Sequence, residues 1–98
     1  MFKTITDLKE ANREAGLHFF DRDTMRFFKS KVESGMYAGR YFITSEQGPH
    51  GPRKYTIREA RSDAAVIDAS NFMQYSDLDD ARADARELAK EARALSTK

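Results

Sequence analysis

The last quarter of the chain carries a stripe of small and apolar residues that limits how the whole domain can pack. Its members follow one another at spacings of three and four and are Leu78, Ala81, Ala85, Leu88, Ala92 and Leu95. This spacing places them on one face of an α-helix, and the capping-box pattern that begins at Ser76 predicts a helix over 77–95. Half of the stripe is alanine, so the helix can approach a partner closely but must lie on larger side chains.

Predicted β-strands in the middle of the chain supply those larger side chains. Residues 40–46 are rich in β-branched and aromatic types, residues 53–59 alternate in character, and residues 64–69 predict a further strand. The segment 47–52 contains two prolines, which cannot donate to a β-ladder, and is typical of a hairpin loop. Consecutive strands joined by short turns form an antiparallel meander.

Alternation assigns the residues of the second strand to two faces of the sheet. The surface expected beneath the C-terminal helix comprises Tyr41, Ile43, Tyr55 and Ile57. Lys54, Thr56 and Arg58 point the other way, and we expect that face to be solvated. A stripe that faces the core predicts a cost of roughly 2–5 kcal/mol for Leu88→Ala.

The first part of the chain predicts a helix, then a shorter helical piece and a short strand. Thr4 is a favourable N-cap and Gly16 can adopt the left-handed conformation that ends a helix, so we expect a helix over 5–15. Short apolar runs around 22–28 fit either a strand or one to two helical turns. We favour the helical turns, which would carry Met25 and Phe28 inward, followed by a strand at about 29–34.

These elements predict a single α+β domain over residues 1–98. Its expected architecture is a small antiparallel sheet of three to four strands in a meander, with an N-terminal helix and a long C-terminal helix packed on one face. The stripe also fits a coiled coil, but its alanine content and its length of under three heptads disfavour that reading.

Composition excludes several classes of protein. The chain has no cysteine, which rules out disulfides, thiolate nucleophiles and Cys-containing zinc sites and favours a reducing compartment such as the cytoplasm. The start of the sequence has charges throughout and no apolar core, so it does not resemble a signal peptide. No apolar run approaches the roughly 20 residues that a membrane span needs, so we expect no membrane association.

The sequence offers no pattern typical of catalysis, a cofactor or a metal. His18 and His50 are isolated, without metal-ligand spacing; we expect the first to be packed or at a helix end and the second exposed. The acidic residues between 77 and 84 lie along one helix, whereas acid–base catalysis needs carboxylates in unlike environments. We therefore expect a protein that is not an enzyme, holds no cofactor and acts by binding.

Basic residues on the predicted strands are the candidates for partner binding. Residues 22–61 carry nine basic and four acidic side chains, whereas residues 62–98 carry five basic and eight acidic ones. Three interpretations remain open for this basic group, namely a solvated sheet face, a nucleic-acid-binding face and a protein-binding face. The candidate partner-binding residues are Arg40, Arg53, Lys54 and Arg58.

Several blocks of the sequence resemble a family of short uncharacterised proteins of bacteriophages and mobile elements. The blocks lie at residues 8–16, 18–20 (HFF), 24–30 (TMRFFKS), 39–46 (GRYFITSE) and 55–58 (YTIR). The segment after residue 60 departs from that family, in which an acidic or aromatic strand precedes the last helix. The resemblance implies a phage or plasmid accessory protein in the host cytoplasm, and such proteins often act on host machinery.

The expected function follows from this resemblance and from the absence of catalytic patterns. We expect a small accessory protein that binds and inhibits or redirects a host protein, with inhibition of a CRISPR–Cas complex as one case by analogy. The alternative is a nucleic-acid-binding module that uses the basic sheet face. A homodimer through an open sheet edge or the alanine-rich helix is compatible with the first hypothesis.

Overall fold

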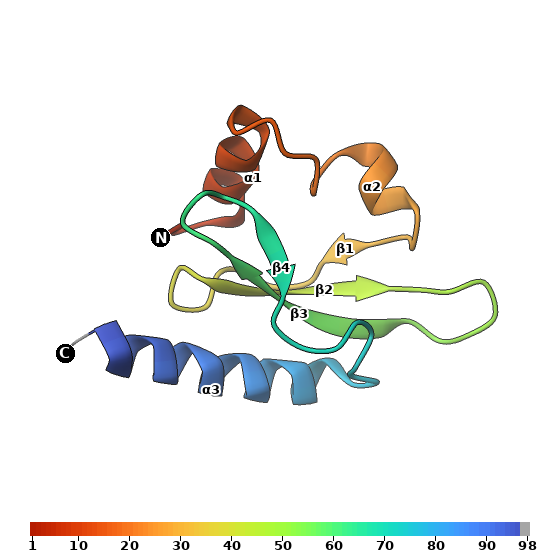
Figure 1. Cartoon of the computed structure of the whole chain (residues 1–98). Helices are drawn as coiled ribbons and strands as arrows, with labels where there is room; N and C mark the ends of the chain where they lie inside the picture. The colour runs from red at the N-terminus through yellow and green to blue at the C-terminus, as the bar shows by residue number, and fades with distance from the viewer. Residues whose placement is uncertain (97–98) are drawn as a thin grey trace.

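A computed structural model describes residues 1–96, in which a four-stranded sheet lies between helices (Figure 1). In chain order the elements are α1 (Ile5–Glu14), α2 (Arg22–Arg26), β1 (Lys31–Val32), β2 (Tyr41–Glu46), β3 (Lys54–Ala60), β4 (Val66–Asp68) and α3 (Leu78–Ser96). The strands follow one another in the order β1-β2-β3-β4, and all neighbours are antiparallel. The predicted α+β meander is therefore confirmed.

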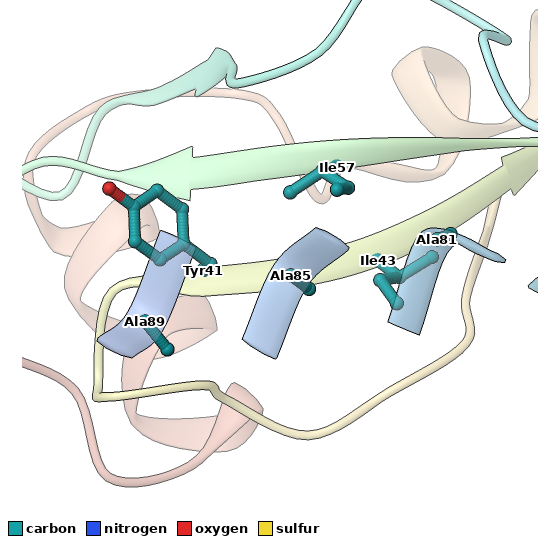
Figure 2. Close-up of a cluster of buried hydrophobic side chains, with 6 residues drawn as sticks. All are labelled: Tyr41, Ile43, Ile57, Ala81, Ala85 and Ala89. Atoms are coloured by element: carbon teal, nitrogen blue, oxygen red, sulfur yellow. The ribbon is translucent and has the colours of Figure 1, made fainter. Parts of the chain in front are cut away.

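The face of the sheet toward α3 holds one half of the core. Figure 2 shows this cluster between the helix and strands β2 and β3; its buried members are Tyr41, Ile43, Ile57, Ala81, Ala85 and Ala89. The predicted stripe needs two corrections, because Ala89 belongs to its buried line and Leu95 is 70% exposed. Leu88 and Ala92 flank the cluster and are only partly buried. Alanines four residues apart form the ridge that meets the sheet, and the leucines lie beside it.

The start of α3 also differs from the predicted capping box. The side-chain carboxylate of Asp77 accepts a hydrogen bond of 2.8 Å from the backbone N–H of Asp79. Asp77 therefore caps the helix, and Ser76 does not. An aspartate is as good an N-cap as a serine, so the sequence pattern alone does not choose between two adjacent candidates.

The opposite face of the sheet is covered by α1 and by the segment that follows it (Figure 1). Thr4 caps α1 as predicted, and its hydroxyl accepts from the backbone N–H of Asp7 at 3.1 Å. Leu8 is fully buried against Phe42. Asn12 is buried as well and donates to the carbonyl of Ala64 at 2.9 Å. Each face of the sheet therefore has its own hydrophobic cluster.

The solvated face predicted from the alternation of β3 is therefore wrong. The alternation itself is correct, because Phe42 pairs with Arg58 and Thr44 with Thr56 on one side. However, Thr56 is fully buried and only 9% of Arg58 is exposed. Polar side chains can line a buried face when their hydrogen bonds are satisfied within it. The strand pattern gives the direction of a side chain but does not say what covers it.

The segment between α1 and β2 adopts the helical alternative. Residues 22–26 form α2, and β1 is a strand of two residues within the predicted range 29–34. Met25 is partly buried, but Phe28, which was also expected to point inward, is 37% exposed. Its neighbour Phe27 is 79% exposed. This turn therefore places large apolar side chains at the surface.

Candidate partner-binding surface

A buried ion pair lies on the sheet face opposite α3. Glu46 at the end of β2 is fully buried, and its carboxylate lies 3.1 Å from the guanidinium of Arg58 on β3. The same carboxylate accepts hydrogen bonds from the hydroxyls of Thr56 at 2.7 Å and Ser30 at 3.3 Å. A charge removed from water needs such partners, since burial without them is strongly unfavourable.

Arg58 is held by three different groups. Its Nε donates to the hydroxyl of Thr44 at 2.9 Å, its Nη2 to Glu46, and its Nη1 to the carboxylate of Asp68 on β4. The guanidinium also lies near two aromatic rings, at 5.2 Å from the centroid of Phe19 and 5.5 Å from that of Phe72. Those contacts are in the range of cation–π interactions, and together they fix the side chain in one place.

Above this network three phenylalanines form an exposed cluster, here called the aromatic patch, that consists of Phe27, Phe28 and Phe72. The rings of Phe27 and Phe28 are 4.7 Å apart, and those of Phe28 and Phe72 are 5.0 Å apart. Phe72 is 40% exposed although it is large and apolar. An exposed group of adjacent aromatics on a small domain is unfavourable in water and is typical of an interaction site.

The aromatic patch borders a cavity of about 490 Å³, here called the aromatic pocket. Its lining residues are Phe19, Asp23, Thr24, Met25, Phe27, Phe28, Ser30, Arg58 and Phe72. They come from α2 and the two loops that flank it, and from the distant strand β3 and the loop after β4. Concave sites of this size with mostly apolar walls and a few polar groups are typical of binding sites.

The backbone beside the aromatic patch adopts unusual conformations. Lys29, which follows Phe28, has φ of 51°, and Met73, which follows Phe72, has φ of 58°. Residues other than glycine rarely adopt this left-handed backbone conformation. Hydrogen bonds hold both turns, because Arg53 donates to the carbonyl of Lys29 at 2.8 Å and Met73 N–H donates to Thr56 at 2.8 Å. The phenylalanines are therefore positioned by the fold rather than by their own turn alone.

The four basic residues predicted to bind a partner do not form one surface. Arg58 lies in the buried network, and Arg53 donates to the backbone of Lys29 and to Ser45. Arg40 precedes β2 and forms an ion pair of 2.7 Å with Glu59, and that hydrogen bond raises the pKa of Arg40. Lys54 is partly buried at the start of β3. Sequence reasoning placed these residues on one sheet, but each points to a different environment.

The aromatic patch was missed in the sequence, although one signal pointed to it. Phe28 was expected to point inward with Met25, as large apolar residues usually do, and neither Phe27 nor Phe72 was assigned to a surface. The signal was the position of Phe72 in the connector before the last helix, where no regular period of apolar residues indicates burial. A loop that carries adjacent phenylalanines is a candidate interaction site.

Other titratable groups are engaged at the surface. His18, expected to be packed or at a helix end, is exposed in the loop after α1, and its Nδ1 lies 2.7 Å from the carboxylate of Asp21; His50 is exposed as predicted. The hydroxyl of Tyr75 donates to the carboxylate of Asp84 at 2.7 Å; burial, that hydrogen bond and the carboxylate charge raise the pKa of Tyr75 to about 12.

Within residues 1–96, no group of three or more side chains is placed to hold a metal ion, and no helix is both long and apolar enough to cross a membrane.

One comparison with known proteins gives a match. A family of unknown function, DUF7447, matches residues 4–86, which includes every element except the last turns of α3. No curated protein and no solved structure matches the chain.

Proposed function

The chain belongs to the DUF7447 family, whose function is unknown, and we propose that it is a binding module that captures another protein through the aromatic patch. In this proposal the chain is not an enzyme. It is an accessory protein of a bacteriophage or mobile element that inhibits or redirects a host protein, with a CRISPR–Cas defence complex as one case. The observation that carries the proposal is the exposure of Phe27, Phe28 and Phe72 side by side.

The aromatic patch supports a protein partner for energetic reasons. Aromatic side chains are the residues that most often dominate protein–protein interfaces, because they bury a large area with few rotatable bonds. The rings are held by packing against one another and by the hydrogen-bonded turns at Lys29 and Met73. Side chains that are already ordered lose less conformational entropy on binding.

The basic residues give less support to the nucleic-acid alternative. Arg40, Arg53 and Arg58 all have hydrogen-bond partners within the chain. Phosphate binding would have to compete with those contacts. If nucleic acid were nevertheless the partner, affinity should fall steeply between about 50 and 200 mM salt, and a gel-shift series over that range would detect it.

The test uses the full chain and two matched substitutions. We expect Phe27→Ser to abolish capture of a protein from a lysate of the natural host, whereas Ile67→Ser, an exposed residue on β4, should leave it unchanged. The captured protein is then purified and its affinity for wild type and both variants is measured by calorimetry. Circular dichroism and thermal melting establish that both variants fold.

Two results would overturn the proposal. One is a captured protein whose affinity is the same for Phe27→Ser and for the wild-type chain. The other is an interaction that Phe27→Ser and Ile67→Ser weaken equally, since that would point to a general effect on folding rather than to the aromatic patch.

A further inference from the structure

Resting on the proposed function, we propose that the partner protein meets the aromatic patch with an acidic segment, in which aspartates or glutamates flank an apolar side chain. The exposed phenylalanines account for the apolar contact. The charged side chains around them define what surrounds that contact, because within residues 1–96 the basic ones exceed the carboxylates available to pair with them.

Basic side chains outnumber acidic ones around the aromatic patch. The group comprises the charged residues of 21–30 and those of the sheet and the 47–53 loop that share this face or contact the turn at Lys29. Six are basic and four are acidic, which gives a net charge of +2. They are Arg22, Arg26, Lys29, Arg53, Lys54 and Arg58, and Asp21, Asp23, Glu46 and Asp68.

The charges of β1 do not alter this balance. Lys31 lies opposite Ser45 in the register, and the backbone of Glu33 bonds that of Ile43. Residues that pair across neighbouring strands point to the same face, and Ile43 faces α3. Lys31 and Glu33 therefore belong to the other face of the sheet, where their charges cancel.

Every carboxylate of the group already has a partner. The exposed acids bond to groups within three residues of them, and the two sheet acids share one guanidinium. The pairs are Asp21 with His18, Asp23 with Arg26, and both Glu46 and Asp68 with Arg58. A basic partner would have to compete for these acids.

Four of the six cations, by contrast, have no carboxylate partner in the described part of the chain. They are Arg22, Lys29, Arg53 and Lys54. Arg22 and Lys29 are exposed. Arg53 donates only to uncharged acceptors, the carbonyl of Lys29 and the hydroxyl of Ser45. Carboxylates that a partner supplies can therefore form ion pairs here without breaking existing ones.

Two of these cations lie on either side of the aromatic patch along the chain. Lys29 directly follows Phe28, and Arg22 begins α2, whose next residue lines the aromatic pocket. The hydrogen bond of 2.8 Å from Arg53 to the carbonyl of Lys29 holds that turn. An apolar side chain on the phenylalanines would thus have acidic neighbours within reach of a cation in both directions.

An acidic protein segment fits this surface better than a nucleic acid does. Asp23 stands among the cations with its side chain 88% exposed, and a strand with a phosphate at every nucleotide would meet it, whereas a peptide can place single carboxylates. The rings are also tilted, at 75° between Phe27 and Phe28 and 60° between Phe28 and Phe72. Successive stacked bases need ring faces that are accessible side by side.

The test uses four short capped peptides as probes. Three have a central tryptophan flanked on both sides by glutamates, glutamines or lysines, and the fourth has alanine between glutamates. Binding to the full chain is followed by NMR, using the methyl signal of Met25 and the ring signals of Phe28 and Phe72. We expect the glutamate–tryptophan peptide to bind at least about threefold more tightly than the glutamine form, and this preference should shrink between about 0.1 and 1 M salt.

Matched double variants separate the local cations from the overall charge. Arg22→Gln with Lys29→Gln should remove most of the preference for glutamate. Arg86→Gln with Lys90→Gln removes the same charge from the exposed face of α3 and should leave the preference unchanged. Phe27→Ser should weaken all three tryptophan peptides. Circular dichroism and thermal melting establish that each variant folds.

Four results would overturn the inference. The first is equal binding of the glutamate and glutamine forms, or tighter binding of the lysine form. The second is equal binding of the tryptophan and alanine peptides, which would indicate charge attraction alone. The third is an oligothymidine that binds more tightly than the glutamate–tryptophan peptide and depends on the same two cations. The fourth is self-association in sedimentation that Phe27→Ser abolishes, since a second copy would then occupy the aromatic patch.

The peptide experiment and the partner experiment fail independently. If affinity for the captured protein depends on Phe27 but not on Arg22 and Lys29, and the peptides show no charge preference, the proposed function stands and this inference is overturned. If the peptides show the preference but partner affinity is the same for Phe27→Ser and wild type, the charge chemistry of the surface is supported and the proposed function is overturned.

Discussion

The guanidinium of Arg58 lies 3.1 Å from the carboxylate of Glu46, on the face of the sheet that does not contact α3. Glu46 is fully buried, and Arg58 is the cation that compensates it. The pair lies beneath the aromatic pocket, where Arg58 forms part of the lining. The stability of this face and the shape of the candidate binding surface therefore depend on the same two residues.

We expect Arg58→Met to destabilise the protein by roughly 3–5 kcal/mol, because it leaves the Glu46 carboxylate buried without its cation. Combining it with Glu46→Gln should recover part of that loss, since the uncompensated charge is then absent. Urea denaturation followed by circular dichroism measures the free energy of unfolding of the single and the double variant. The control is Arg40→Met, whose partly exposed pair with Glu59 should be worth about 1 kcal/mol or less. Equal effects of Arg40→Met and Arg58→Met would contradict the interpretation.

The packing of α3 predicts that enlarging a buried alanine destabilises the protein and that truncating Leu88 costs less than it would in the core. Ala85 is fully buried, so Ala85→Leu should cost about 1–3 kcal/mol through overpacking. Leu88 is only partly buried, so Leu88→Ala should cost about 1–2 kcal/mol, the lower end of the range for leucine truncation or less. Thermal melting measures both effects, since a loss of 1 kcal/mol lowers the melting temperature of a domain of this size by about 4–8 °C. If Leu88→Ala cost more than about 3 kcal/mol while Ala85→Leu cost nothing, α3 would be rotated about its axis.

The left-handed backbone at Lys29 can be tested with a pair of substitutions at one position. Lys29→Gly should leave the free energy of unfolding unchanged within about 1 kcal/mol or raise it, because glycine adopts a φ of 51° without strain. Lys29→Val should lower it by about 1–3 kcal/mol, because a β-branched residue is least tolerated there. If chemical denaturation gives equal stability for both variants, residue 29 does not hold this conformation in solution.

The hydroxyl of Tyr75 predicts a pH dependence in the alkaline range. Its pKa is raised from 10 to about 12 in the folded chain, chiefly by burial and then by the hydrogen bond to Asp84 and its charge. The folded state therefore keeps this proton where the unfolded chain loses it. The stabilisation is complete below pH 10 and is lost as the pH rises from about 10 to about 12.

The measurement compares wild type with two variants at Tyr75 and its partner. The difference in tyrosinate absorbance between wild type and Tyr75→Phe isolates the titration of this one side chain, and its midpoint should lie near pH 12. Asp84→Asn removes the carboxylate charge and should move the midpoint toward 10 while burial remains. A midpoint near pH 10 in the wild-type chain would show that Tyr75 is solvated.

Much of the fold could be predicted because its signals are local. The caps and glycine around α1, the two prolines of the 47–52 loop and the alternation of β3 depend on residues near one another in sequence. The same holds for α3, whose apolar period predicted the helix, although Ala89 and Leu95 were assigned wrongly within it. These patterns act through backbone geometry, so they gave the elements and the order of the meander.

The candidate site could not be predicted in the same way, because the environment of each residue depends on distant segments. Nothing local to Arg58 indicates that Phe19 and Phe72 flank it, or that Glu46 lies below it. The basic strand residues therefore suggested one charged face, whereas the folded chain gives each of the arginines a different partner. Phe28 was expected to point inward and instead lies at the surface beside Phe27.

The sequence by itself determined the helices, the strands and the direction in which each strand residue points, since these follow from steric and hydrogen-bonding rules between near neighbours. Only the tertiary structure decided which sheet face is buried, which ion pair lies within it and which phenylalanines stay exposed. Burial is a property of what packs over a residue, and here the covering segments are up to several tens of residues away in the chain.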